Sequence, residues 1–242
     1  MDEDVAMNVR ESPEELPEGS SISPLGKEDG LPCPTLLTDI ERPIWVLPVI
    51  VASQFASTSL WFAGNAVLDD LTVDLGLPDG SVGFLSSSVQ FGFILGTLVF
   101  ALGSVADRFL PTRVFMTCAI LGALANLAVI VAAKGLAGLL ILRGLTGFFL
   151  AGIYPVGMKV AADWYGNVGL GGALGYLVGA LVLGTAFPFL LRQIKQSWQA
   201  LLIEVSVLSS VAGLTMGFIC PDGPHRKASG PKFEPMAILH LF

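Results

Sequence analysis

The sequence predicts an all-α, polytopic membrane protein with six transmembrane helices. Of its 242 residues, 53 % are apolar and only 14 % are charged. The charged residues are separated by six long stretches, each long enough to supply the roughly 20 apolar residues with which a helix crosses a hydrocarbon core of about 30 Å. The core of a water-soluble domain does not repeat this pattern six times, so we exclude a soluble globular fold.

The first 42 residues differ in composition from the rest of the chain. They contain 11 acidic residues, 3 basic residues and five prolines among serines and glycines. Such a segment cannot bury enough apolar area to offset the loss of chain entropy, so we expect residues 1–42 to be a disordered, acidic cytoplasmic tail. Its acidity also argues against a secretory signal or an organelle transit peptide.

The expected transmembrane domain occupies residues 43–220. Its six stretches are each bounded by charged residues, at residues 43–68, 80–106, 114–133, 135–158, 164–191 and 196–220. Only two of them contain a charge, which is Arg143 in the fourth stretch and Glu204 in the sixth. We expect residues 221–242 to begin a cytoplasmic central loop.

The basic residues orient the expected bundle, because cytoplasmic loops collect positive charge. With the N-terminus inside and the count begun at Lys27, 8 bases fall on inner segments and 3 on outer segments. The outer loop at residues 69–79 carries four aspartates and no base, which agrees with this orientation, whereas Arg192 and Lys195 do not. We therefore expect an integral, multi-pass membrane protein with both termini in the cytoplasm.

Four residues of the first span share one face of a helix. Gln54, Thr58, Trp61 and Asn65 are spaced at i, i+4, i+7 and i+11, which places them within about 60° of arc. Because polar side chains facing lipid are unfavourable, we expect this stripe to line a substrate cavity. The alternative is a stripe that only forms hydrogen bonds between helices.

The fourth span has a similar face, formed by Arg143, Gly147 and Tyr154. An arginine inside the membrane costs about 2.5–3.5 kcal/mol on insertion scales, so it implies a function or a partner. We add Arg143 and Tyr154 to the candidate cavity and take Glu204 as the candidate charge partner of Arg143. The alternative is an arginine that extends to the interface or forms a structural pair.

Glycines recur at helical spacing in two of the spans. They are Gly92, Gly96 and Gly103 in or after the second span, and Gly171, Gly175 and Gly179 in the fifth. Small residues at this spacing let helix backbones approach closely, so we expect both sets to form packing seams.

The composition excludes several other functions. The two histidines lie near the C-terminus and the three cysteines are far apart, so we expect no metal site and no histidine-dependent catalysis within the spans. After the tail, 10 basic and 9 acidic residues form no basic stripe, and nucleic acid is not an expected partner. Without a Walker motif for ATP, we expect neither an enzyme nor a cofactor.

Two segments resemble motifs of one transporter family. Residues 103–113 read GSVADRFLPTR, which resembles the G-x-L-A-D-R-x-G-R-K signature between helices two and three of the major facilitator superfamily. Residues 143–147 read RGLTG, similar to the R-x-x-x-G motif in helix four of that family. Leu110, Pro111 and Thr112 depart from the first signature, and Arg113 supplies a base later than usual.

The resemblance covers about residues 43–220 and implies a fold and a function. Family members normally have two six-helix halves, each built from two inverted three-helix repeats, with the solute between the halves. The resemblance thus implies that this chain is the N-terminal half of a secondary transporter, which moves a small solute by rocking in the lipid bilayer against a second half or a second copy.

The resemblance also implies a gate at the first motif. In the family, this cluster controls the inward and outward states, which implies a gating role for Gly103, Asp107, Arg108 and Arg113. The alternative for this loop is charge that only holds it in the cytoplasm.

A second class of function is a truncated, non-transporting membrane protein that associates with a full-length transporter and regulates it. The absence of a second half from these residues favours this alternative more than any single residue does. An intramembrane protease is disfavoured, because no span contains a histidine that could activate a serine.

Overall fold

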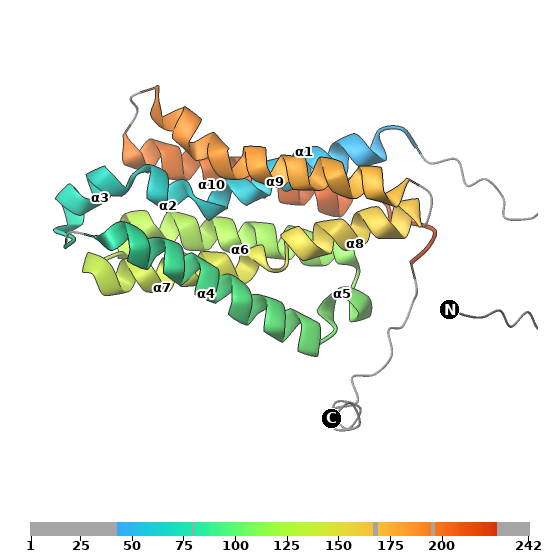
Figure 1. Ribbon diagram of the computed structural model, residues 1–242, viewed down its shortest axis with the longest axis horizontal. Helices are drawn as coiled ribbons and strands as arrows, with labels where there is room; N and C mark the ends of the chain where they lie inside the picture. Colours follow the sequence, from blue (N-terminus) through green and yellow to red (C-terminus); the bar gives the residue numbers. More distant parts are fainter. Residues whose placement is uncertain (1–42, 79, 167–168, 195–196, 227–242) are drawn as a thin grey trace, which may run out of the picture. The chain divides into compact units, whose positions relative to one another are not determined.

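The computed structural model describes residues 43–78, 80–166, 169–194 and 197–226. All regular elements within these residues are helices (Figure 1). In chain order they are α1 Val46–Thr58, the 3-10 helix η1 Ser59–Trp61, α2 Ala63–Ala66, α3 Leu68–Leu75, α4 Ser81–Leu102, α5 Val105–Arg108, α6 Pro111–Ala132, α7 Gly135–Leu150, α8 Tyr154–Tyr165, α9 Leu170–Arg192 and α10 Trp198–Phe218. The predicted tail and residues 227–242 of the predicted central loop lie outside the described residues.

The six predicted spans correspond to these helices. Within the described residues, α4, α6, the pair α7 and α8, α9 and α10 are five segments long and apolar enough to cross a membrane. A shorter apolar helix, formed by α1 and η1, precedes them. The prediction of an all-α, polytopic membrane protein is therefore confirmed.

The first span is interrupted near its middle. The hydroxyls of Thr58 and Ser59 donate hydrogen bonds to carbonyl oxygens of the preceding turn, at 2.8 and 2.6 Å. Such bonds compete with the regular helix and bend it. The backbone then leaves helical geometry at Phe62, with φ of −111°, and at Val67, with φ of −115°. The span is thus a series of short helices that continues through α3, beyond the predicted end at residue 68.

The fourth span is interrupted in the same way, between α7 and α8. Pro155 occupies the first turn of α8 and has no backbone N–H to continue the hydrogen bonding of α7. At the break, a Cβ atom on Gly152 would collide with the side chains of Cys118 and Phe100, so only glycine allows this approach. The span continues to Tyr165 rather than ending at residue 158 as predicted.

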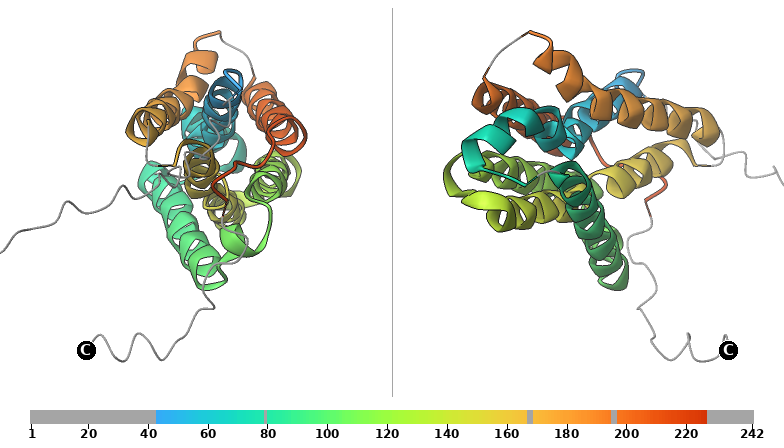
Figure 2. Two further views of the ribbon diagram at one scale, coloured as in Figure 1. Left: turned by 90° about the vertical axis from the view of Figure 1, so that its right-hand side faces the viewer. Right: turned by 60° about the vertical axis from the view of Figure 1, so that its left-hand side comes forward.

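The packing of the spans repeats itself. The second span contacts the fourth, as α4 against α7, and the fifth contacts the first, as α9 against α1. The third span contacts the fourth, as α6 against α7, and the sixth contacts the first, as α10 against α1. Figure 2 shows these helices from two further sides. The contacts of the second and third spans with the fourth thus have counterparts in the contacts of the fifth and sixth spans with the first, as expected for a repeated three-helix unit.

The crossing of α4 and α7 is a glycine seam. A Cβ atom on Gly92 would collide with the backbone of Gly144, and one on Gly147 would collide with the backbone of Val89. The hydroxyl of Ser88 donates to a backbone carbonyl of α7 at 2.5 Å. A Cβ atom on Gly96 would collide with the backbone carbonyl of Phe148 of α7. The seam predicted in the second span is therefore confirmed at Gly92 and Gly96.

The seam predicted in the fifth span is not formed among the described residues. Apart from the adjacent residues and the backbone of α9 itself, no described atom lies within 4 Å of a Cβ built on Gly171, Gly175 or Gly179. Instead, α9 approaches α1 through Gly184, whose built Cβ would collide with the backbone of α1. Gly103 is also not in a seam, because its nearest neighbours belong to its own turn. The spacing of glycines identifies a smooth helix face but not the neighbour that covers it.

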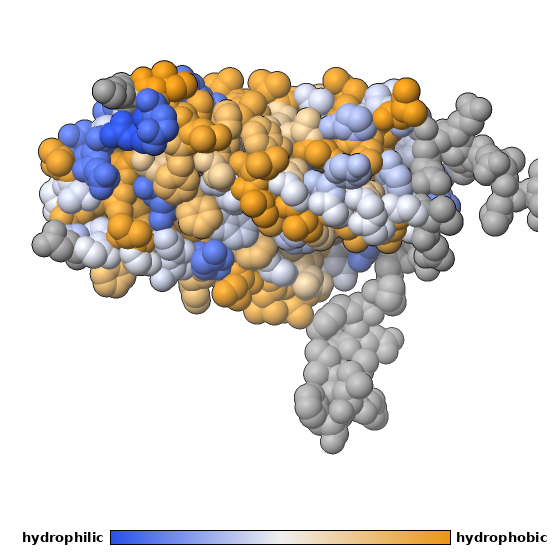
Figure 3. Space-filling model, turned by 45° about the horizontal axis from the view of Figure 1, so that its top comes forward, coloured by the Kyte–Doolittle hydropathy of each residue, from blue (hydrophilic) through white to orange (hydrophobic). Residues whose placement is uncertain are grey.

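Apolar side chains cover the outside of the bundle, as expected for a protein in lipid. Phe91 of α4 and Phe218 of α10 are each 69 % exposed. Figure 3 shows one face on which hydrophobic residues cover most of the surface and hydrophilic residues gather mainly at one end.

Candidate solute path and gate

A polar network surrounds Arg143 of α7, whose side chain is completely buried. Its Nη2 donates to the carbonyl oxygens of Leu60 and Trp61 at 3.1 and 2.5 Å, and its Nη1 donates to Asn126 Oδ1 at 3.0 Å. Leu60 and Trp61 end η1, where interruption of the first span leaves carbonyls without helical partners. Arg143 of the fourth span therefore caps the break in the first span.

Asn126 of α6 connects this cap to the sixth span. Its Nδ2 donates to Ser206 Oγ at 3.0 Å and to Leu202 O at 3.3 Å, both on α10. Asn126 and Ser206 are completely buried. The network joins the first, third, fourth and sixth spans. Sequence analysis missed Asn126, for which a polar amide within the apolar third span was the only signal.

The first two residues of the predicted stripe, Gln54 and Thr58, are completely buried. The amide of Gln54 lies against Gly157 of α8, where any side chain would collide with it. Neither polar atom of this amide has a hydrogen-bond partner in the described part of the chain. Thr58 uses its hydroxyl within α1, on Gln54 O at 2.8 Å.

The other two residues of the stripe, Trp61 and Asn65, are only partly buried. The rings of Trp61 and Phe93 of α4 lie with their centroids 4.8 Å apart. Asn65 Nδ2 donates to Ser86 Oγ at 2.8 Å. Trp61 Nε1 and Asn65 Oδ1 are themselves buried and lack a partner among the described residues. The stripe thus divides into a buried pair and a pair at the edge of the bundle.

Tyr154 and Glu204 lie apart from the Arg143 network. Tyr154 begins α8 next to the break in the fourth span and is partly exposed. Glu204 lies on the exposed side of α10. The hydrogen bonds of Arg143 go to an amide and two carbonyls, so Glu204 is not among its bonded partners. A functional role for Tyr154 or Glu204 stays a prediction.

The predicted gating loop forms an ion pair with the fourth span. Lys159 Nζ of α8 lies 3.2 Å from Asp107 Oδ1 of α5 and 3.4 Å from Asp163 Oδ1 of α8. The side chains of Lys159 and Asp107 are 27 % and 43 % exposed. A hollow of about 180 Å³ between α4 and α8 includes Asp107 and Lys159 in its lining. Sequence analysis did not select Lys159, although it is the base nearest the end of the fourth span.

The other residues of the predicted gate are spread along the same loop. Gly103 ends α4, and a Cβ there would lie 3.0 Å from Val99 O. Arg108 is exposed. The guanidinium of Arg113 lies 5.5 Å from the centroid of the Phe218 ring on α10, a cation–π contact. Only Asp107 of the four forms an ion pair with α8.

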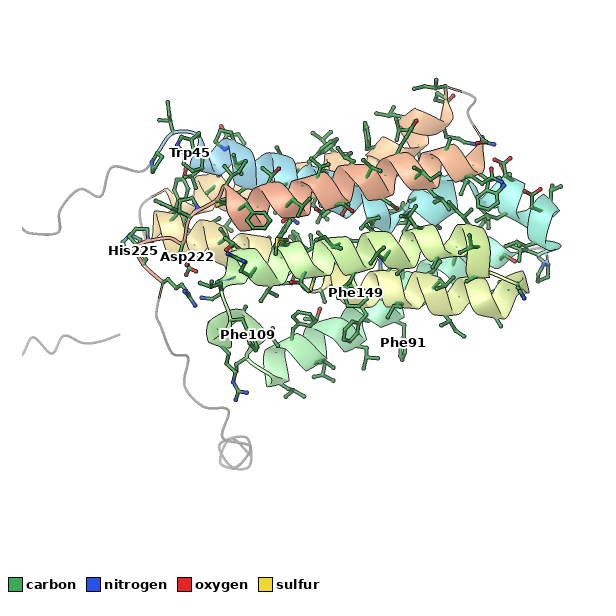
Figure 4. All side chains as sticks on the ribbon, turned by 180° about the vertical axis from the view of Figure 1, so that it is seen from behind. Trp45, Phe91, Phe109, Phe149, Asp222 and His225 are labelled. Carbon is green, nitrogen blue, oxygen red and sulfur yellow. The ribbon has the colours of Figure 1, made fainter. Side chains whose placement is uncertain are left out.

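Residues 221–226, at the start of the predicted central loop, lie at the same end of the bundle as this gate (Figure 4). Trp164 Nε1 donates to Pro221 O at 3.0 Å, and the backbone N–H of His225 donates to Asp163 O at 2.9 Å. Burial, with a smaller contribution from the carboxylate of Asp222, raises the pKa of the Cys220 thiol to about 11. The chain that leaves the sixth span is thus held against the end of α8.

At the opposite end, α3 is bonded to the ends of the fifth and sixth spans. Asp70 Oδ1 lies 2.8 Å from Arg192 Nη2 of α9. Asp74 Oδ2 accepts a hydrogen bond from Trp198 Nε1 of α10 at 2.6 Å. Arg192, an exception to the predicted sidedness of the bases, therefore has an acidic partner on the same side of the bundle.

Comparison with known proteins identifies one family. Residues 50–240 match the family model described as Major Facilitator Superfamily. A search of curated proteins found no match. Among the described residues, no group of three His, Cys, Asp or Glu side chains is arranged to hold a metal ion.

Proposed function

Because the chain belongs to the major facilitator superfamily, a family of membrane transporters, we propose that its six spans form the N-terminal half of a secondary transporter for a small solute. The repeated packing carries this proposal. The contacts of α4 with α7 and of α6 with α7 recur as those of α9 with α1 and of α10 with α1. Such a half bundle is built from two inverted three-helix repeats.

The solute path runs beside the broken first and fourth spans. Interrupted helices in membrane proteins occur where the backbone is buried in protein or lines a cavity, and both breaks lie close to polar side chains. Trp61 and Asn65 lie at the edge of the bundle and are the wall that faces the solute. Gln54 and Thr58 lie deeper, while Arg143 supports the wall from behind. Tyr154 continues the wall at the second break.

The ion pair of Asp107 with Lys159 is the proposed gate. It joins the loop between the second and third spans to α8, the part of the fourth span that follows the break, and both side chains are partly exposed. Exposed pairs contribute only about 0–1 kcal/mol, so this contact can open and close during transport. Gly103, Arg108 and Arg113 shape and flank the same loop.

The second half of the transporter, or a second copy of this chain, packs on the uncovered helices. Gly171, Gly175 and Gly179 of α9 leave a smooth face without neighbours among the described residues. A close helix partner suits such a face. In this arrangement the gate and the N-terminus lie on the cytoplasmic side, as the distribution of basic residues favours.

Reconstitution tests the proposal. The full chain is purified and inserted into liposomes as a monomer fraction and as a crosslinked dimer fraction, and solute flux is measured for each. We expect flux from the dimer. If neither fraction shows flux, but the chain lowers the flux of a full-length relative in the same liposomes, the result would instead favour a regulatory protein that does not transport.

A further inference from the structure

Arg143 is a completely buried cation whose hydrogen-bond partners are all uncharged. They are one amide oxygen, on Asn126, and the two carbonyl oxygens of Leu60 and Trp61. In the described part of the chain, no carboxylate lies within 4.0 Å of this guanidinium. These dipoles bind the terminal nitrogens Nη1 and Nη2 of the guanidinium. They leave its positive charge uncompensated, and buried charges are normally paired.

The positive charge of Arg143 lies directly behind the proposed solute wall, which is formed by Trp61 and Asn65. Arg143 is bonded to the backbone of Trp61, and a Cβ atom on Gly64 would lie 2.9 Å from Arg143 Nε. The absence of a side chain at Gly64 thus brings the guanidinium against the segment that carries Trp61 and Asn65. An arginine does not lose its proton in proteins, so this charge is permanent.

The polar groups around the break also favour a solute that accepts hydrogen bonds. Trp61 Nε1 and Arg143 Nε are two N–H donors that are buried without a partner in the described residues. Asn65 Oδ1 is an acceptor with the same status after the break, and Ser57 Oγ and the amide of Gln54 have it before the break. A permanent positive charge together with two unused donors attracts an anion and repels a cation.

We propose that the transported solute is a small anion, bound at Trp61 and Asn65 and held by the charge of Arg143. This inference rests on the proposed transport function. At an effective dielectric constant of about 20, a unit positive charge about 10 Å from a bound anion changes the binding constant of that anion by more than about tenfold. An anion is therefore expected to bind at least about tenfold more tightly than a neutral molecule of the same shape.

Asn126 offers a variant that tests this charge directly. Asn126→Asp keeps the size of the side chain and the oxygen 3.0 Å from Arg143 Nη1, but it adds a negative charge that neutralises the guanidinium. Gln193→Glu is the matched control, because it adds the same charge at an exposed residue that follows α9.

The experiment measures equilibrium binding to the full chain in detergent. Formate is compared with formamide and methylammonium, and benzoate with benzamide and benzylammonium. We expect one acid of the two series to bind at least about tenfold more tightly than its amide, with no binding of the ammonium ions. Asn126→Asp is expected to remove this preference and Gln193→Glu to retain it.

Each other result has a defined meaning. Equal binding of acid and amide, or binding of an ammonium ion, overturns the anion inference but leaves transport of a solute in place. If Asn126→Asp leaves the preference for the acid unchanged, the charge of Arg143 does not cause that preference. No binding of any of the six compounds overturns the anion inference, and the absence of flux in liposomes in addition overturns the proposed function. The comparison of acid with amide uses the unaltered chain, so it holds even where Asn126→Asp fails to fold.

Discussion

Arg143 and Asn126 are joined by a hydrogen bond of 3.0 Å between Nη1 and Oδ1, and both side chains are completely shielded from solvent. Asn126 uses its other polar atom on Ser206 and Leu202. A single amide thus connects the cap of the broken first span to the sixth span. Because Asn126 is neutral, it does not compensate the positive charge of Arg143.

Replacement of this amide is expected to destabilise the bundle. Asn126→Ala leaves an N–H of the buried Arg143 guanidinium without a partner, so we expect a loss of about 3 kcal/mol in the free energy of unfolding. Ser210→Ala on α10 is the control, because the hydroxyl of Ser210 bonds only within its own helix, and it should cost less than about 0.5 kcal/mol. Denaturant unfolding in detergent micelles measures both. Equal stability of the two variants would show that the network does not hold the spans together.

Two glycine variants distinguish the real seam from the open helix face. Gly147→Ala places a methyl group against the backbone of Val89, which neither helix can avoid without moving, so we expect a loss of at least about 2 kcal/mol. Gly175→Ala places the same methyl group in open space and improves helix propensity, so the chain should be unchanged or more stable by up to about 1 kcal/mol. Thermal unfolding of the isolated chain in detergent compares them. Destabilisation by Gly175→Ala would contradict the uncovered face of α9.

Asp107→Asn removes the charge that faces Lys159 at 3.2 Å. Because the pair is partly exposed, the expected change in stability is less than about 1 kcal/mol, while the balance of inward and outward states shifts. The measurement is the labelling rate of a cysteine placed at Ala101, in the lining of the adjacent hollow. Asp222→Asn, in a pair with Arg226, is the control. An unaltered labelling rate in Asp107→Asn would remove the gating role.

A double-mutant cycle tests the contact of α3 with the fifth span. Asp70→Asn and Arg192→Gln each break the pair seen at 2.8 Å, and together they should show a coupling energy of about 0.5–1 kcal/mol, since both side chains are about 30 % exposed. The coupling should fall as salt is raised from low concentration to about 1 M. A coupling of zero would mean that Asp70 and Arg192 do not stabilise the bundle as a pair.

Cysteine labelling tests the proposed orientation. Val73→Cys on α3 is suitable, because Val73 is 81 % exposed and the substitution leaves the bond of Asp74 to Trp198 in place. An impermeant maleimide applied to intact cells should label position 73 and not the native Cys33 of the tail. Cys118 and Cys220 are buried, and the raised pKa of Cys220 keeps its thiol protonated and slow to react at neutral pH. Labelling of Cys33 alone would invert the orientation.

The spans could be predicted from the sequence because charged residues other than Arg143 and Glu204 lie outside the apolar stretches, and charge is unfavourable in lipid. The extension of the first span beyond residue 68 could not be predicted in this way. The aspartates of α3 end the apolar stretch, but the helix continues because Asp70 and Asp74 have partners on α9 and α10. The helical structure of the first span therefore continues past the end of its apolar stretch.

The polar stripe could be predicted from spacing alone, but its division into buried and edge residues could not. That division depends on which neighbour covers each turn, such as Gly157 of α8 over Gln54. The partners of Arg143 were equally inaccessible, because a search for acidic residues overlooks the backbone carbonyls that an interrupted helix exposes. The role of Lys159 could not be predicted either, because it depends on the distance of 3.2 Å between Lys159 Nζ and Asp107 Oδ1 in the folded chain.

The cap on the first span has a consequence for how the protein is made. The carbonyl of Trp61 depends on a donor that lies 82 residues later in the chain. When the ribosome has delivered only the first span, that donor has not yet been synthesised, and an unsatisfied carbonyl is strongly unfavourable in hydrocarbon. The carbonyl of Trp61 therefore receives this donor only after the fourth span has been made, so that the final shape of the first span depends on a helix that is inserted later.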